Sequence, residues 1–125
     1  MKEKFSWKKR GKSFIYAARG IKSFITREHN AWIHAAVTVL AVASGFALRI
    51  TRGEWIAVIL CIGIVFAAEA FNTAIERLTD IVSPGYDKRA GDVKDIAAGA
   101  VFICAIMAMA VGMLIFIPRL LALIP

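Results

Sequence analysis

The chain has 125 residues, of which 59% are apolar, and a mean hydropathy of +0.67, far above that of a soluble globular domain. This composition excludes a disordered tail and argues against a water-soluble enzyme. The formal net charge of +7 suits nucleic acid or an anionic membrane surface, and the apolar content favours the membrane. Cys61 and Cys104 lie in apolar runs with no Cys-x-x-Cys spacing, so we expect buried side chains rather than zinc ligands or a disulfide.

The amino-terminal segment, residues 5–27, has the pattern of an amphipathic helix that lies in the membrane interface. Apolar residues such as Phe14 and Ile21 recur at helical spacing, whereas Lys12 and Lys22 fall on the other side. A simple basic anchor for anionic lipid fits the same periodicity. The apolar chain that follows argues against a nucleic-acid-binding arm.

Three further stretches are apolar enough to cross a bilayer, since a span needs roughly 20 such residues. They cover residues 31–48, 55–75 and 96–117. The third is expected to end at Pro118. A tight polar link follows the first span, and a longer charged link, from Arg77 to Asp95, contains the turn signal Ser83-Pro84-Gly85. The sequence thus predicts a single membrane domain over residues 1–125.

The distribution of basic residues predicts the orientation. Nine of the 16 Lys and Arg residues lie in residues 1–29 and four lie in residues 76–95, which leaves three elsewhere. Because basic flanks are retained in the cytoplasm, we expect the amino terminus and the second link to be cytoplasmic. A cleaved signal peptide is not expected, because a long basic segment precedes the first apolar run.

A carboxylate within the second span is costly and usually functional. Glu69 lies there, followed by Asn72, Glu76 and Asp80; at about 100° per residue the four share one helix face about 80° wide. Glu69 and Glu76 are roughly 10 Å apart along the helix axis, so we expect them to act differently. The deeper Glu69 suits a general base, whereas Glu76, with Glu28 as a second carboxylate, suits a hard cation such as Mg²⁺.

Charged residues around the second link extend this site. Asp80, Lys94 and Asp95 bracket the link, and Lys94 is a candidate phosphate partner. Together with the acidic face they predict a metal–nucleotide site at the membrane surface. No glycine-rich phosphate-binding motif is present.

Other interpretations of these residues stay open on pattern alone. Glu69 and Asn72 also fit an interhelical hydrogen-bonded pair in an oligomer, or part of an ion or proton path through a small channel. A non-catalytic membrane adaptor is a third possibility. Acidic residues beside Arg77 and Arg89 fit solvated ion pairs. For His34, a hydrogen bond that packs two helices is favoured over a ligand role.

Two segments decide between these interpretations: EAFNTAIERLTD at residues 69–80 and KDIAAGAV at residues 94–101. On these segments the chain resembles the prokaryotic diacylglycerol kinase and undecaprenol kinase family, with similarity from about residue 14 to residue 118. The resemblance implies an all-α membrane protein with three transmembrane helices and an amphipathic surface helix, assembled as a homotrimeric bundle with active sites shared between chains. It also implies a location in the bacterial cytoplasmic membrane and no nucleic-acid partner.

The resemblance further implies transfer of the γ-phosphate of MgATP to a lipid hydroxyl. Three features look more like the undecaprenol kinase branch of the family: Glu28-His29-Asn30 with His34, the run at residues 94–101, and Phe-Ile-Pro at residues 116–118. This likeness implies undecaprenol rather than diacylglycerol as the lipid.

Carried over by position, Glu69 is the catalytic base and Asn72 lies beside it, while Glu28 and Glu76 hold Mg²⁺. Lys9 stands where some members have Arg, so a nucleotide contact there is not carried over. The residues implied in nucleotide binding are Tyr16, Glu28, Glu76, Asp80, Gly85, Tyr86, Asp87, Lys94 and Asp95.

Overall fold

The computed structural model describes residues 4–125, and over that range the chain forms helices and short connections with no strand. Lys2, counted above among the basic residues, lies outside this range. The helices are α1 (Trp7–Arg27), α2 (His29–Ala47), α3 (Arg52–Val82) and α4 (Lys88–Leu121). Three of them, α2, α3 and α4, are long and apolar enough to cross a membrane. The all-α membrane fold class is therefore confirmed.

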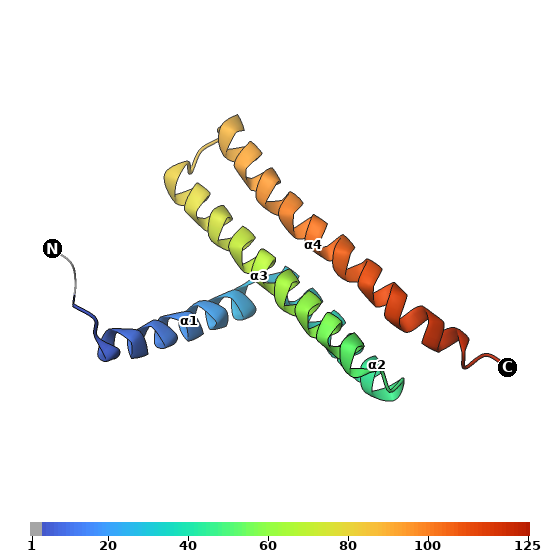
Figure 1. Ribbon diagram of the computed structural model, residues 1–125. Helices are drawn as coiled ribbons and strands as arrows, with labels where there is room; N and C mark the ends of the chain where they lie inside the picture. The colour runs from blue at the N-terminus through green and yellow to red at the C-terminus, as the bar shows by residue number, and fades with distance from the viewer. Residues whose placement is uncertain (1–3) are drawn as a thin grey trace.

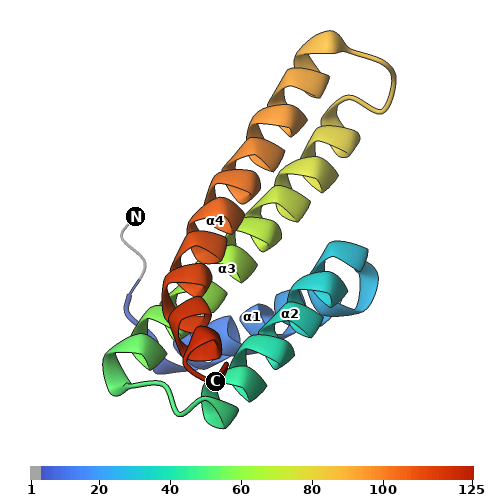
Figure 2. The same cartoon turned by 90° about the vertical axis from the view of Figure 1, so that its right-hand side faces the viewer.

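The two longest helices, α3 and α4, run antiparallel and side by side along most of their length (Figures 1 and 2). A five-residue connection, residues 83–87, joins them. Helices joined by so short a connection usually pack antiparallel. Helix α2 packs on α3, and α1 projects sideways from the other three helices (Figure 1). The amphipathic helix expected at the amino terminus is thus a separate arm.

Polar side chains at the helix starts explain where the helices begin. Ser6 accepts a hydrogen bond from the Lys9 backbone at the start of α1, and Asp87 caps α4. At the start of α3, Thr51 and Glu54 form a capping box, in which each side chain bonds the other residue's backbone N–H. Each cap satisfies N–H groups that have no partner within the helix.

The helices extend beyond the stretches that hydropathy marked as spans. Helix α3 continues through residues 76–82, which the sequence pattern placed in the second link, and α4 begins at Lys88. Helix α4 also continues through Pro118 to Leu121 rather than ending at the proline. Hydropathy reports which residues suit a bilayer, whereas a helix continues as long as its backbone bonds and caps allow. Pro118 removes one backbone hydrogen bond, yet α4 continues for three residues beyond it.

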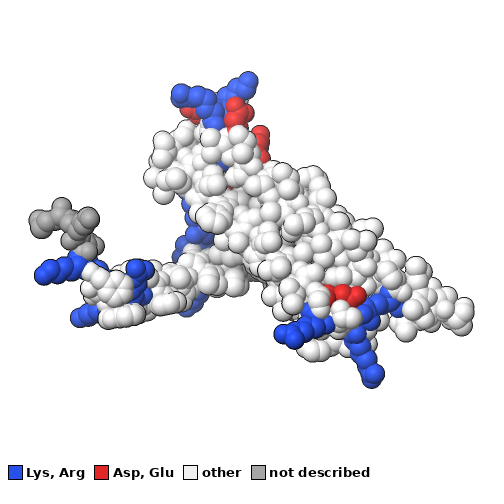
Figure 3. Space-filling model, viewed as in Figure 1, with Lys and Arg blue, Asp and Glu red and all other residues white. Residues whose placement is uncertain are grey.

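Packing within the chain leaves much apolar surface uncovered. A small buried cluster of Ile50, Val58 and Ile115 holds α4 against the start of α3. By contrast, Phe102 is 66% exposed and Leu114 is 78% exposed, both on α4. Such a surface is typical of a chain whose surroundings are apolar rather than aqueous. On the face seen in Figure 3, Lys and Arg gather on α1, whereas the two ends of the α3–α4 pair carry both basic and acidic side chains.

One of these ends is closed by an arginine. Arg119, near the end of α4, donates hydrogen bonds to the carbonyl oxygens of Leu48 and Arg49, both at 3.2 Å, and to the Glu54 carboxylate at 2.6 Å. Arg49 has a φ of 51°, an uncommon conformation for a residue with a side chain. The bonds to the α2–α3 turn help to hold that conformation. We call this region, residues 45–55 with Arg119, the Arg119 end.

Candidate active site

Glu69 is the most deeply placed carboxylate, with only 4% of the residue exposed. Its Oε1 atom lies 3.0 Å from Nε2 of His34 on α2. Helices α2 and α3 run in opposite directions, and this brings two residues 35 positions apart to the same depth. His34 thus makes the interhelical hydrogen bond that its sequence context favoured. The sequence did not indicate that its partner is Glu69.

Asn72, one turn further along α3, is also buried, with 6% of the residue exposed. Its Nδ2 donates to Glu76 Oε1 at 3.4 Å, whereas its Oδ1 is buried without a hydrogen-bond partner among residues 4–125. Glu69 and Asn72 therefore do not pair with each other. A buried amide oxygen with no donor, next to a carboxylate, is an arrangement that a cation would satisfy.

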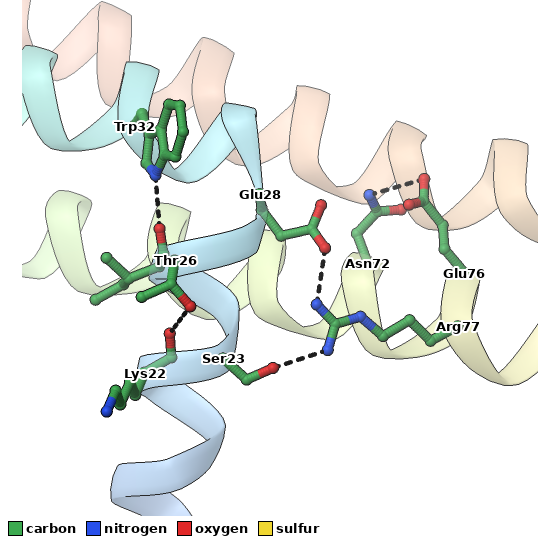
Figure 4. A network of polar contacts seen from close by, with 9 residues as sticks. Lys22, Ser23, Thr26, Glu28, Trp32, Asn72, Glu76 and Arg77 are labelled. Carbon is green, nitrogen blue, oxygen red and sulfur yellow. Dashed lines mark hydrogen bonds and ion pairs between the residues drawn. The ribbon is translucent and has the colours of Figure 1, made fainter.

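Glu28 is the single residue between α1 and α2. Its Oε1 accepts a hydrogen bond from the Arg77 guanidinium at 2.9 Å, and the same guanidinium donates to Ser23 on α1 at 3.1 Å. Figure 4 shows the Glu28 side chain pointing toward Asn72 and Glu76. The ion pair considered between Glu76 and Arg77 is absent from the described residues: Arg77 turns to Glu28 instead.

Glu28, Asn72 and Glu76 together offer ligands that suit a hard cation. No cluster of three or more His, Cys, Asp or Glu residues that could hold a metal occurs within residues 4–125. Glu28, Glu76 and the unpartnered Asn72 oxygen are all oxygen donors, which Mg²⁺ prefers. Mg²⁺ commonly takes one or two carboxylates and completes its shell with water and substrate phosphates. The residues present therefore fit a cation that arrives with a phosphate ligand.

A polar hollow of about 510 Å³ lies where α3 passes into α4. An ion pair between Lys94 and Asp80 joins the two helices beside it. Arg89 donates from its side chain and its backbone N–H to Asp87, and these bonds hold the pKa of Asp87 below its ordinary value of 3.8. The predicted nucleotide-binding residues that line this hollow are Asp80, Gly85, Tyr86, Asp87, Lys94 and Asp95.

Three predicted nucleotide-binding residues lie outside this hollow: Glu28 and Glu76, described above, and Tyr16, which lies on α1 and is 60% exposed. The guanidinium carbon of Arg19, on the same helix, lies 6.0 Å from the centroid of the Tyr16 ring. Within residues 4–125, no hydrogen bond or ion pair joins Tyr16 to the polar hollow. The structure therefore brings together the hollow, and separately the group of Glu28, Asn72 and Glu76, but it leaves Tyr16 apart from both.

An apolar groove of about 570 Å³ runs along α2, α3 and α4, and His34 forms part of its wall. Its other lining residues include Val37, Val65, Phe66 and Ala108. Sequence patterns did not predict this groove, because it depends on how three helices are spaced. Its chemistry suits a hydrocarbon chain, and the Glu69–His34 pair lies next to it.

Comparison with known proteins places this geometry in context. Residues 15–116 match the family model described as prokaryotic diacylglycerol kinase. The chain is 38% identical over 109 residues to the undecaprenol kinase of Bacillus subtilis (strain 168), a match that covers 87% of this chain and 89% of that protein. It is 36% identical over 114 residues to the diacylglycerol kinase of a Synechocystis strain, with coverage of 89% of this chain and 64% of that protein.

These matches confirm the resemblance inferred from residues 69–80 and 94–101. They favour a lipid kinase over an ion-conducting oligomer that would use the same acidic face. A kinase requires a nucleotide phosphoryl donor.

Proposed function

Because the chain belongs to the prokaryotic diacylglycerol kinase family, we propose that it transfers the γ-phosphate of MgATP to the hydroxyl of a membrane lipid, undecaprenol in preference to diacylglycerol. Family membership makes the protein a lipid kinase with membrane-spanning helices. The observation that carries the finer proposal is the buried Glu69, held by His34 beside an apolar groove.

Glu69 takes the proton from the lipid hydroxyl in this proposal. Its hydrogen bond to His34 fixes the carboxylate at one depth and leaves the second oxygen for the substrate. The neighbouring groove offers space for the lipid chain. Asn72, one turn away, lies between the base and the carboxylate of Glu76.

Glu28 and Glu76 hold Mg²⁺, with the unpartnered oxygen of Asn72 as a further donor. When bound, Mg²⁺ supplies positive charge next to the transferred phosphoryl group. The protein's own contribution is to position these oxygens on α3 and on the α1–α2 junction. Phosphoryl transfer depends mainly on such positioning and charge neutralisation, so a small helical scaffold suffices.

The polar hollow binds the rest of the nucleotide. Lys94, which forms an ion pair with Asp80, is the residue that we expect to bind a phosphate. Tyr86 is 99% exposed at the rim and offers a ring for base stacking. Asp95 and Gly85 complete the lining.

The homotrimer belongs to the same proposal. Tyr16 is exposed on the projecting helix α1, away from the hollow of its own chain, and this favours a contact with a site on a neighbouring chain. The exposed apolar face of α4 is available for helix packing between chains. We place the site, with the amino terminus, on the cytoplasmic side of the bacterial inner membrane, where ATP is present and basic residues are retained.

The preference for undecaprenol rests on the likeness of residues 28–30 and His34 to the undecaprenol kinase branch of the family. The relatives named undecaprenol kinase and diacylglycerol kinase are 38% and 36% identical to this chain. Both lipids present a primary hydroxyl, so the site residues themselves do not separate them. The apolar walls of the groove are where we expect the selectivity to reside.

The test is transfer of labelled phosphate from ATP to each lipid in mixed micelles. We expect a higher kcat/KM for undecaprenol, and we expect Glu69→Gln to lower the rate at least about 100-fold, the scale of a lost general base. Glu54→Gln, a matched change at the other end of α3, should retain the rate below its melting temperature. An unchanged rate in Glu69→Gln would contradict the role of the base, and preference for diacylglycerol would reverse the substrate assignment.

A further inference from the structure

Arg77 is the one residue that joins α3 both to α1 and to the α1–α2 junction through hydrogen bonds of its side chain, among residues 4–125. One guanidinium nitrogen donates to Ser23 and another to Glu28. The side chain is 43% exposed and that of Glu28 is 28% exposed, so water reaches the pair from one side. Neither the predicted site nor the family resemblance assigned Arg77 any role.

Glu28 lies at a point where a small movement has a large effect. It is the only residue between two helices, and its backbone is extended, with φ −110° and ψ 118°. On the far side of the same bend, the Trp32 indole N–H donates to the Ile25 carbonyl oxygen at 2.6 Å. The angle of α1 therefore depends on two clamps, of which only Arg77 reaches across to α3 (Figure 4).

The carboxylate held by Arg77 is also one of the two proposed for Mg²⁺. Glu28 points toward Asn72 and Glu76, whose amide oxygen and carboxylate lie across from it (Figure 4). A carboxylate bonded to a guanidinium already has its charge neutralised in part, so it attracts a second cation less strongly. Arg77 and a divalent cation therefore compete for the negative charge of Glu28.

We infer that Arg77 is an exchangeable counter-ion of Glu28, which weakens binding of a divalent cation without nucleotide and is displaced when the cation arrives with a nucleotide. This inference rests on the proposed metal role of Glu28 and Glu76. The exchange also loosens the bond from Arg77 to Ser23, so occupation of the site is coupled to the inner end of α1. Arg77 is a positioning residue, since it acts through Glu28.

The experiment measures Mn²⁺ binding without nucleotide, by electron paramagnetic resonance, on the full chain in non-ionic micelles. In Arg77→Gln the affinity should rise about threefold, the scale of an exposed ion pair. Arg77→Lys keeps the charge but loses the planar guanidinium, which bonds two acceptors at once. Its affinity for Mn²⁺ should therefore lie between those of the wild type and Arg77→Gln. Ser23→Ala breaks only the contact to α1, and its affinity should remain that of the wild type.

A second measurement, of melting temperature, distinguishes a counter-ion role for Arg77 from a purely structural one. In EDTA, Arg77→Gln should melt at a lower temperature than the wild type, because α1 has lost its link to α3. Added Mg²⁺ should then raise its melting temperature more than that of the wild type, since the cation binds an unopposed Glu28. A purely structural brace would lower the melting temperature without this larger response.

The outcomes distinguish this inference from the proposed function. Equal or weaker Mn²⁺ binding in Arg77→Gln, with binding still lost in Glu28→Gln and Glu76→Gln, would overturn the counter-ion role and leave the metal site standing. Mn²⁺ binding that ignores both carboxylate changes, or no binding to any variant, would overturn the metal site and the counter-ion role together.

Discussion

The two ends of the helical bundle use polar groups in different ways. At the Arg119 end, a guanidinium donates hydrogen bonds to two carbonyl oxygens and a carboxylate. At the opposite end, which we call the Glu28 end (residues 23–34, 69–80 and 87–95), a carboxylate, an amide and a second carboxylate lie close together (Figure 4). Within residues 4–125, the one arginine bonded to this group is Arg77, and its partner in the group is Glu28.

Each end has one buried polar atom without a partner among the described residues, and the kind of atom differs. At the Arg119 end it is a nitrogen of Arg119 itself, a donor in a group whose charge Glu54 already balances. At the Glu28 end it is the Asn72 oxygen, an acceptor beside the unbalanced carboxylate of Glu76. A spare donor in a paired group is compatible with a structural role, whereas a spare acceptor beside a carboxylate calls for a cation.

The largest effect is expected when one carboxylate of the Glu28 end is neutralised. Glu76→Gln should lower lipid phosphorylation about 100-fold, comparable to removal of a group that stabilises transition-state charge. Raising Mg²⁺ should recover part of the loss. Kinase assays over a Mg²⁺ series test this, with Glu54→Gln, a carboxylate change at the Arg119 end, as the control. A normal rate at low Mg²⁺ would remove Glu76 from the metal site.

The Arg119 end should respond in stability rather than in catalysis. Arg119→Met loses three hydrogen bonds and leaves Glu54 without its cation, so we expect a melting temperature about 5 °C lower. Arg119→Lys should recover only part of this, because an ammonium cannot bond the two carbonyl oxygens and the carboxylate in one plane. Thermal unfolding in micelles measures both. A larger loss of activity than of stability in Arg119→Met would contradict the structural role.

A smaller effect is expected at the close approach of α2 and α3 near the same turn. A Cβ atom at Gly45 would lie 2.7 Å from the Trp55 ring, so Gly45→Ala must displace that ring. The cost of overpacking should exceed the gain in helix propensity and lower the melting temperature by about 3 °C. Gly53→Ala, where nothing lies within 4 Å of the added atom, is the matched control and should be neutral or stabilising. Equal melting temperatures for the two variants would refute the close contact.

The smallest effect concerns the cap of α4 at the Glu28 end. The pKa of Asp87 is lowered in the folded chain, chiefly by the Arg89 side chain, so the ionised cap stabilises the fold above pH 3.8. That contribution disappears as the pH falls through the lowered pKa, which lies below 3.8. Asp87→Asn should therefore melt slightly below the wild type at pH 7. The difference should shrink toward zero below pH 3.8, and a difference that grows in acid would contradict this sign.

The sequence alone determined the features that depend on local properties of the chain. Hydropathy identified three stretches suited to a bilayer, and the spacing of Glu69, Asn72 and Glu76 placed them on one side of one helix, because helical geometry is the same in every context. The two segments at residues 69–80 and 94–101 were enough to indicate the family, which the comparisons confirm.

The hydrogen-bond and ion-pair partners of these residues became known only from the folded structure. That Glu69 meets His34, that Arg77 turns from its neighbour Glu76 to Glu28, and that Arg119 closes the opposite turn all depend on how distant helices lie against one another. Periodicity specifies the direction in which a side chain points around the axis of its own helix. It does not specify which other helix packs against that face. Pairing between helices is set by packing over the whole chain, and so it becomes visible only when the chain is folded.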